Sequence, residues 1–270
     1  MGMNMKELMT HEEQQRVAKN ILKNFKEFCI ENGLRYYLAY GTLLGAVRHK
    51  DIIPWDYDID VFMPRPDFDK FLELTKNKDI KDKFHTFSHL NTPGYYLWFA
   101  KVCDKDTRLV ITKTRSKIPL GMWIDIFPLD AIPEDIDAEK KLRKEIEDLQ
   151  IKAIYPVRND LKGIYRIAQI VRCMFSRAKS EDLLKQAHNL ARQKDYEKAK
   201  AVGSFLWYET SERETIDRSY YEETTILPFG EENYAVPLRY DEILRRSYGD
   251  YMTPPKEIEE PRCFAYYINK

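Results

Sequence analysis

Residues 36–63, YYLAYGTLLGAVRHKDIIPWDYDIDVFM, decide the fold that we expect for this chain. The aromatic and apolar run at residues 36–40 predicts a short buried strand, and Gly41 and Thr42 then open an apolar segment with helical spacing. A second strand is predicted at residues 58–63, where acidic and apolar residues alternate. The stretch therefore predicts a strand, a tight glycine turn, a helix N-terminus and a second strand.

The second predicted strand carries two carboxylates, Asp58 and Asp60. Alternation along a strand puts both on one face and turns Ile59 and Val61 to the other, and Asp56 continues the acidic alternation. Neighbouring acids repel each other unless a cation lies between them, and Mg²⁺ is commonly held by one or two carboxylates together with substrate phosphates. These aspartates are therefore predicted to bind Mg²⁺ or Mn²⁺. The alternative is an edge strand with one solvated face.

The start of the predicted helix is a candidate phosphate site. The first N–H groups of a helix have no partner within the helix, and they bind phosphate. Gly41 and Thr42 would therefore contact a substrate phosphate through N–H groups and a hydroxyl. Arg48 is the first candidate for a cationic clamp and Lys101 is the second, although both side chains could instead be surface charges.

The longer string at residues 40–65, YGTLLGAVRHKDIIPWDYDIDVFMPR, resembles the LicD family, the phosphocholine transferases of bacterial surface glycans. Relatives of that family include the fukutin-type ribitol-phosphate transferases. The resemblance extends to residues 121–130 and 227–255. It implies an α+β fold with a nucleotidyltransferase-like mixed sheet core flanked by helices. The chain departs from the family pattern at Asp51, where glycine is usual, and at Tyr57, which interrupts a usual run of three acids.

A further acid, Asp125, lies in the apolar run MWIDIF at residues 122–127. A lone carboxylate in such a strand is costly unless it is paired or ligates a cation. The resemblance implies that Asp125 supplies the third metal-binding carboxylate from a strand beside the first acidic one. It would also take the proton of an acceptor hydroxyl. The alternatives are an outward-pointing side chain or a pair with Lys or Arg, and Asp130 is predicted to lie in a turn or at a helix start.

The resemblance implies metal-dependent transfer of phosphocholine from CDP-choline to a sugar hydroxyl of a teichoic acid or lipooligosaccharide precursor, with release of CMP. Asp58, Asp60 and Asp125 would carry the catalysis, and Asp56 would join them at the metal. The acceptor would be a lipid-linked or nucleotide-linked glycan precursor. Three alternatives stay open: a nucleotidyltransferase that uses an NTP, transfer of CDP-activated ribitol or glycerol phosphate, and an inactive binding protein on the same fold.

Choline binding would require aromatic faces, because a quaternary ammonium group is attracted to them and has no hydrogen-bond donor. Trp55 is the first candidate for this substrate contact. The further candidates are Tyr57, Tyr95, Tyr96, Trp98 and Trp123.

Composition narrows the partners and the compartment. Lys plus Arg and Asp plus Glu both number 44, so the net charge is zero and no nucleic acid is expected as a partner. The four cysteines are far apart, which favours reduced thiols. The first residues are too polar for a signal peptide, and no apolar run approaches the roughly 18 residues of a membrane span. We therefore expect a cytoplasmic protein, and peripheral contact with the inner face of the cell membrane stays open.

The pattern of elements predicts three segments. Residues 1–136 form the catalytic core, with a long first helix that starts at a capping box and a mixed sheet of about five strands, including strands at residues 95–102, 109–112 and 122–127. Residues 137–201 form a helical insertion with at least three helices. Residues 202–270 complete the catalytic domain with short strands and a helix.

One predicted helix of the insertion, at residues 162–179, has an apolar face with a basic border. This pattern is typical of a helix that lies on a membrane surface. It is also typical of a helix that packs on the catalytic domain while its arginines reach the solvent. The sequence favours the packing alternative.

Overall fold

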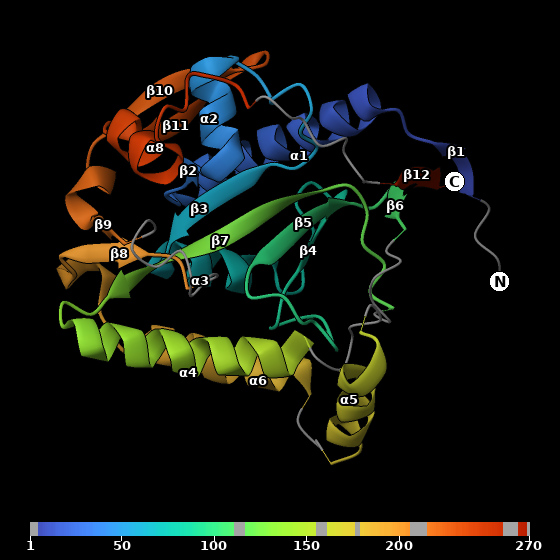
Figure 1. Ribbon diagram of the computed structural model, residues 1–270. Coiled ribbons are helices and arrows are strands. Elements are labelled where there is room, and N and C mark those ends of the chain that lie inside the picture. Colours follow the sequence, from blue (N-terminus) through green and yellow to red (C-terminus); the bar gives the residue numbers. More distant parts are fainter. Residues whose placement is uncertain are drawn as a thin grey trace.

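The computed structural model describes residues 5–110, 117–154, 161–175, 179–205, 215–255 and 264–268, and it has the predicted α+β fold (Figure 1). The elements in chain order are β1 (Met5–Leu8), α1 (His11–Asn32), β2 (Tyr37–Leu38), α2 (Tyr40–Arg48), β3 (Asp60–Pro64), α3 (Arg65–Thr75), β4 (Phe84–Phe87), β5 (Ala100–Asp104), β6 (Thr107–Leu109), β7 (Trp123–Ile132), α4 (Ile136–Ile154), α5 (Gly163–Phe175), α6 (Ser180–Ala191), η1 (Tyr196–Lys198), β8 (Ala201–Gly203), β9 (Ile216–Asp217), η2 (Arg218–Tyr221), β10 (Thr224–Phe229), β11 (Glu232–Pro237), α8 (Tyr240–Tyr248) and β12 (Ala265–Ile268).

The core is a mixed sheet in which the described strands follow the order β2-β3-β7-β5-β4, with β8 pairing with β7 and β9 with β8. β3 and β7 are parallel, and every other neighbouring pair is antiparallel. The five-strand path agrees with the expected mixed sheet. β1, β12 and β6 form a separate small sheet, and β10 and β11 form a hairpin.

Helices α1 and α3 cover one face of the main sheet. α1 begins at the predicted capping box, where the Thr10 hydroxyl accepts from the Glu13 N–H and the Glu13 carboxylate accepts from the Thr10 N–H. The ring of Phe25 in α1 meets the ring of Phe71 in α3 edge-on, with centroids 5.4 Å apart. Both helices contact β7. The opposite face is left to α2 and to the side chains of the candidate site.

A buried ion pair joins α3 to β7. Asp130 is fully buried in β7, and its oxygens accept hydrogen bonds from Nε and Nη2 of Arg65 at 2.6 and 2.8 Å. Nη1 of Arg65 donates to Nδ1 of His188 in α6 at 3.1 Å, and burial holds the pKa of His188 well below its ordinary value. The prediction that Asp130 lies in a turn or at a helix start is therefore wrong, because β7 continues well beyond the apolar run.

The insertion between β7 and β8 contains the three expected helices. α4 packs against α6, and the two helices form a small apolar cluster with the sheet. Trp98 and Phe205 belong to the same cluster. Figure 1 shows α5 set apart below the rest of the chain.

Two strand predictions need correction. The expected strand at 95–102 begins only at Ala100, since residues 95–99 are loop, and β6 ends at Leu109. Residues 111 and 112 of the expected strand at 109–112 lie outside the described part of the chain.

Candidate active site

Two acids and a lysine form a row across three neighbouring strands. Asp60 in β3 is the direct parallel partner of Asp125 in β7, and Asp125 is the direct antiparallel partner of Lys101 in β5. Directly paired residues point to the same face of a sheet, so these side chains lie side by side. They occupy the face that α1 and α3 leave open. The structure thus brings together three residues that the sequence separates by up to 65 positions.

Asp125 already has two partners in this row. Its Oδ1 accepts from Nζ of Lys101 at 2.6 Å, and its Oδ2 accepts from the indole N–H of Trp123 at 3.0 Å. Burial raises the pKa of Asp125, while Lys101 and Trp123 oppose that shift by stabilising the anion. The pairing alternative for Asp125 is therefore found in the structure. Lys101 is therefore a partner of Asp125 in this structure, and its predicted role as a second cationic clamp stays a prediction.

Asp56 and Asp58 lie in the segment that leads into β3, so the regular strand is shorter than predicted. Burial, followed by a shared hydrogen bond with Asp58 and repulsion from it, raises the pKa of Asp56 to about 7. Burial and then the charges of Asp58, Asp125 and Asp56 raise the pKa of Asp60 well above its ordinary value. The four predicted metal-binding acids are therefore close enough to repel one another.

Binding of a divalent ion places requirements on both the geometry and the chemistry of these acids. In the part of the chain that the structure describes, no group of three Asp, Glu, His or Cys side chains is placed so that it could hold an ion as it stands. Asp125 accounts for part of this, because both of its oxygens are engaged. The chemistry of Asp56, Asp58 and Asp60 nevertheless fits a hard cation, because all three are oxygen donors. Burial, and then repulsion between the carboxylates, raises the pKa values of Asp56 and Asp60, and a cation would relieve that repulsion.

The first turn of α2 lies beside these acids. Tyr40 opens the helix in the left-handed region, at φ 45°, and its ring packs against Phe62 and Phe127 with centroids 4.9 and 5.5 Å away. A bulky residue in that region is strained, and the ring contacts offset the cost. A side chain on Gly41 would place Cβ 3.1 Å from Oδ2 of Asp56, so glycine permits this carboxylate to approach the helix N-terminus. The tight turn predicted at Gly41 is thus made by Tyr40.

The Thr42 hydroxyl has a role that the sequence did not reveal. It accepts a hydrogen bond from the backbone N–H of Asp60 at 2.8 Å, which ties the start of β3 to the first turn of α2. Thr42 is buried, so this bond is protected from water. The N–H groups at the start of α2 remain the predicted contacts for phosphate.

We expect Thr42→Val to lower the free energy of unfolding by about 1–2 kcal/mol, because the Asp60 N–H loses its acceptor while the side-chain shape is kept. Urea unfolding measures this change. Thr75→Val is the matched control, since the buried Thr75 hydroxyl only donates to the Phe71 carbonyl of its own helix. If the two variants lose the same free energy of unfolding, the hydrogen bond between Thr42 and Asp60 makes no special contribution to stability.

Arg48 and Trp55 lie together at the other end of α2. Nη1 of Arg48 donates to the carbonyl of Tyr251 at 2.8 Å, and its guanidinium lies 5.9 Å from the centre of the Trp55 ring. The ring of His49 meets Trp55 edge-on. Arg48 therefore ties α2 to the segment after α8, and its predicted role as a phosphate clamp stays a prediction. The guanidinium of Arg48 thus already lies beside the ring of Trp55, the predicted choline contact.

The other aromatic candidates divide into two groups. Tyr57 and Trp123 lie on the acidic face with ring centroids 6.1 Å apart, and Nζ of Lys101 lies 4.4 Å from the Trp123 ring. Tyr95, Tyr96 and Trp98 lie outside this pair and are buried, and Trp123 is buried too. The six candidates consequently do not surround one open cage in this structure.

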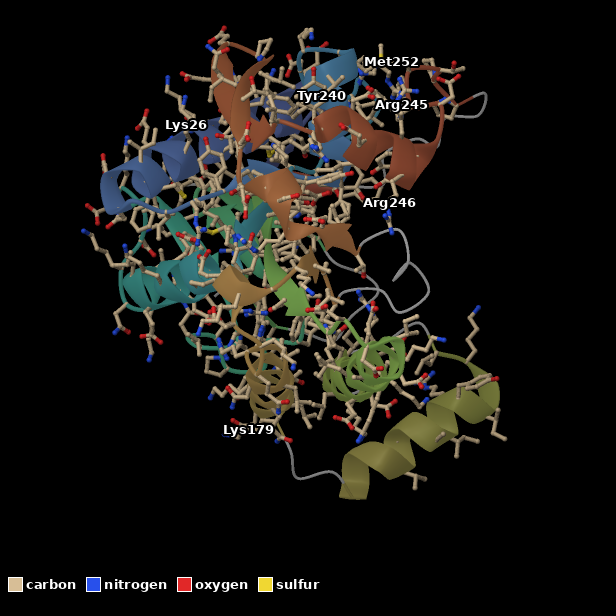
Figure 2. The ribbon with its side chains drawn as sticks, turned by 90° about the vertical axis from the view of Figure 1, so that its left-hand side faces the viewer. Lys26, Lys179, Tyr240, Arg245, Arg246 and Met252 are labelled. Atoms are coloured by element: carbon tan, nitrogen blue, oxygen red, sulfur yellow. The ribbon has the colours of Figure 1, made fainter. Side chains whose placement is uncertain are left out.

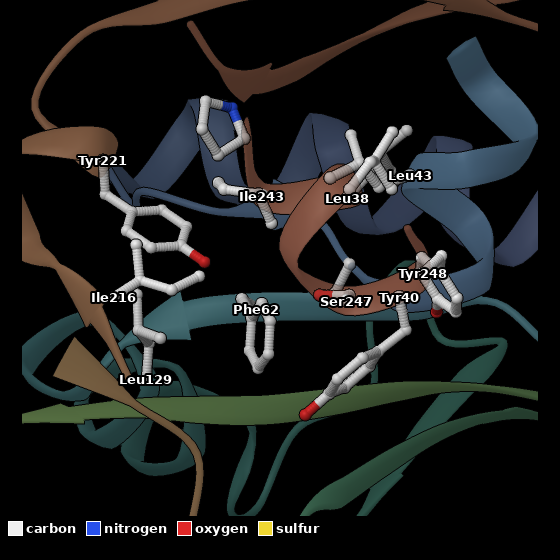
Figure 3. Close-up of a pocket in the computed structure, with 13 residues that line it drawn as sticks. Leu38, Tyr40, Leu43, Phe62, Leu129, Ile216, Tyr221, Ile243, Ser247 and Tyr248 are labelled. Atoms are coloured by element: carbon white, nitrogen blue, oxygen red, sulfur yellow. The ribbon is translucent and has the colours of Figure 1, made fainter. Parts of the chain in front are cut away.

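A narrow pocket lies beside the acidic face (Figure 3). It encloses about 30 Å³, which is room for a water molecule or two and would have to widen to admit a larger group. Tyr40 and Phe62 connect it to the elements that carry the acids, and α8 contributes Ile243 and Ser247. Its lining is mainly apolar and aromatic. The residues that line it are Leu38, Ala39, Tyr40, Leu43, Phe62, Leu129, Ile216, Tyr221, Pro237, Ile243, Leu244, Ser247 and Tyr248.

Two contacts of the site were not foreseen, and they differ in how they could have been found. Trp123 lies two residues before Asp125 on the same strand, so the alternation of the strand places both on one face. That signal was available in the sequence. The pairing of Lys101 with Asp125 depends on the antiparallel register of β5 and β7, for which no local signal exists.

Comparison with known proteins agrees with this architecture. Residues 33–155 match the model of the LicD/FKTN/FKRP nucleotidyltransferase domain, a range that includes α2, β3, β5 and β7. The chain carries a LicD-family nucleotidyltransferase domain. Within this LicD domain lie Asp56, Asp58, Asp60, Asp125 and the first turn of α2.

Individual relatives extend the comparison beyond the LicD domain. The chain is 29% identical over 268 residues to the lipopolysaccharide cholinephosphotransferase LicD of Haemophilus influenzae, which covers 94% of this chain and 96% of the relative. A segment of 29 residues is 69% identical to the ribitol 5-phosphate transferase FKRP of Homo sapiens and of Mus musculus, but it covers only 11% of this chain and 6% of each relative. The first similarity therefore concerns the whole chain, and the second concerns a short motif.

Proposed function

We propose that this chain transfers phosphocholine from CDP-choline to a sugar hydroxyl of a bacterial surface glycan precursor, a teichoic acid or a lipooligosaccharide, and releases CMP. The observation that carries the proposal is the placement of Asp60 beside Asp125 on the open face of the sheet, next to the first turn of α2. The choice of phosphocholine is supported by the similarity to the Haemophilus cholinephosphotransferase along almost the whole chain.

The acids have separate roles in this proposal. Asp56, Asp58 and Asp60 would hold Mg²⁺ or Mn²⁺, with Asp125 beside them. A bound divalent ion supplies neutralisation of the diphosphate charge and orientation of the donor. The N–H groups of Gly41 and Thr42 bind a donor phosphate at the positive end of α2. The cation would thus offset the negative charge of both the acidic cluster and the donor diphosphate.

The transfer itself moves one phosphoryl group. The acceptor oxygen forms a bond to the phosphorus that carries choline, and the bond from that phosphorus to the bridging oxygen breaks. CMP leaves with the bridging oxygen, and the hydroxyl proton passes to Asp125. Burial raises the pKa of Asp125, which makes it a stronger base than an exposed aspartate. Lys101 and Trp123 hold its two oxygens and so fix its orientation.

Transfer of ribitol phosphate from CDP-ribitol is the second candidate. The short, highly similar segment shared with the ribitol 5-phosphate transferase FKRP favours it. The aromatic rings of Tyr57 and Trp123 beside the acids suit a quaternary ammonium group better than a polyol, because a polyol requires polar partners. We therefore place choline first.

A donor comparison tests the proposal. The protein is incubated with CDP-choline, CDP-ribitol, CDP-glycerol or CTP, with a sugar acceptor and Mg²⁺, and CMP and pyrophosphate are quantified. We expect kcat/KM for CDP-choline to exceed that for CDP-ribitol at least about tenfold, equivalent to about 1.4 kcal/mol. EDTA should abolish CMP release. Faster turnover of CDP-ribitol would replace choline by ribitol, and pyrophosphate from CTP would identify an NTP-dependent nucleotidyltransferase.

A further inference from the structure

Helix α5 exposes its apolar side chains. Every side chain of α5 that the structure describes is exposed, including Ile164 at 74% and Ile167 at 64%. Figures 1 and 2 show from two directions that the helix projects away from the sheet and from α4. The packing alternative favoured by the sequence is therefore wrong for the described residues of α5. The apolar face of α5 can be shielded from water only by a surface other than the catalytic domain.

The apolar residues of α5 form a continuous stripe on one side of the helix. Ile164, Ile167, Ala168 and Val171 follow the spacing that places residues on one side of a helix, and Arg166 falls outside that stripe. Isolated exposed apolar residues are ordinary, but a contiguous stripe on a helix marks an interaction surface.

The charge of the segment identifies the kind of surface. Residues 162–179 contain five basic residues and no acidic residue, whereas the whole chain has 44 of each sign. The basic residues are Lys162, Arg166, Arg172, Arg177 and Lys179. A second copy of this chain would bring the same positive charges together, and a nucleic acid would leave the apolar stripe uncovered. An anionic lipid surface satisfies both features at once.

We infer that α5 docks on an anionic phospholipid bilayer, with its apolar stripe in the interface and its basic residues at the head groups. No helix in the described part of the chain is long and apolar enough to cross a bilayer. The inference goes beyond the proposed function, since it concerns the surface that α5 meets and not the donor. It is also testable without any turnover.

The test measures sedimentation of the full chain with vesicles at low salt. We expect at least about tenfold stronger binding to vesicles that contain phosphatidylglycerol than to pure phosphatidylcholine. Replacing three exposed basic residues, Lys162→Gln, Arg166→Gln and Lys179→Gln, should weaken binding about a hundredfold, at roughly fivefold per charge. Figure 2 labels Lys179, which lies where the chain enters α6.

Two further variants separate charge from apolar contact. The substitutions Ile164→Gln, Ile167→Gln and Val171→Gln remove the apolar stripe. Glutamine is a good helix former, so the helix should be kept while vesicle binding falls at least tenfold. The matched control removes three exposed lysines elsewhere, through Lys76→Gln, Lys78→Gln and Lys198→Gln, and should bind like the wild type.

Two results would overturn the inference. One is a failure of the charge dependence. It would appear as equal binding to anionic and neutral vesicles, or as an equal loss of vesicle binding in the α5 charge variant and the lysine control. The other is self-association without vesicles that the apolar variant abolishes, since this would assign the stripe to a second copy of the chain. Neither result bears on the donor comparison, so the proposed function stands or falls separately.

Discussion

Asp60→Asn is expected to lower kcat/KM by roughly a thousandfold or more while the protein stays folded, a change of about 4 kcal/mol in the barrier. Asparagine keeps the shape and the backbone N–H that Thr42 accepts, but it removes one anionic oxygen donor from the acidic cluster. It also removes a charge that Asp58, Asp125 and Asp56 repel. The melting temperature without metal should therefore be unchanged or higher.

Two measurements make the Asp60 result specific. Mg²⁺ should raise the melting temperature of the wild type, because a ligand that binds the folded state stabilises it, and this rise should be lost in Asp60→Asn. Asp82→Asn serves as the control, since Asp82 is exposed and far from the row of acids in the sequence. An Asp60→Asn enzyme that kept more than about a tenth of the wild-type rate, a barrier change below roughly 1.4 kcal/mol, would show that Asp60 is not a metal ligand.

Asp130→Asn is expected to lower the free energy of unfolding by about 3 kcal/mol. The substitution leaves the buried guanidinium of Arg65 without its two-pronged carboxylate partner. Arg65 keeps a longer ion pair with Asp69, at 3.3 Å, and its hydrogen bond to His188. Removing one member of a buried ion pair is costly because the remaining charge stays desolvated. The same change should loosen α6, since Arg65 also donates to His188. Urea unfolding measures the loss.

An exposed ion pair provides the comparison for Asp130. Glu134 accepts from Lys200 at 2.8 Å, and both side chains are largely exposed, so Glu134→Gln should cost less than about 1 kcal/mol. A double variant, Arg65→Met with Asp130→Leu, should recover part of the loss because it removes both charges together. Equal effects of Asp130→Asn and Glu134→Gln would mean that burial of the Arg65 pair has little energetic weight.

The local elements of this fold could be predicted because their signals are local. The capping box at Thr10 and the apolar spacing after it suffice for α1, and the loss of strand signal after residue 136 suffices for α4, α5 and α6. The ends of the strands were harder to predict than the helices. The run at residues 95–102 has strand composition throughout, but its first part is loop and contributes the buried rings of Tyr95 and Trp98.

The candidate site was predictable as a set of acids and less so as a set of contacts. Asp60 and Asp125 could be named because acids in apolar strands are costly and conspicuous. The partners of those acids could not, since the hydrogen bond from Asp60 to Thr42 and the ion pair of Asp125 with Lys101 depend on how strands are ordered and registered. Burial of Asp130 was missed for the same reason, because Arg65 is distant in sequence.

The route of the chain between β7 and β8 gives the insertion a degree of independence. The chain leaves the sheet after Ile132 and returns at Ala201, and these two residues are direct cross-strand partners. The two ends of the excursion therefore meet at one point of the sheet, and α6 is held again where Arg65 of α3 donates to His188. The entropy of closing such a loop grows only slowly with its length. Helix α5, which projects away from the sheet, can therefore be lengthened, shortened or exchanged without shifting Asp125 in β7. The fold thus allows the exposed surface of α5 to vary while the strands that carry Asp60 and Asp125 keep their positions.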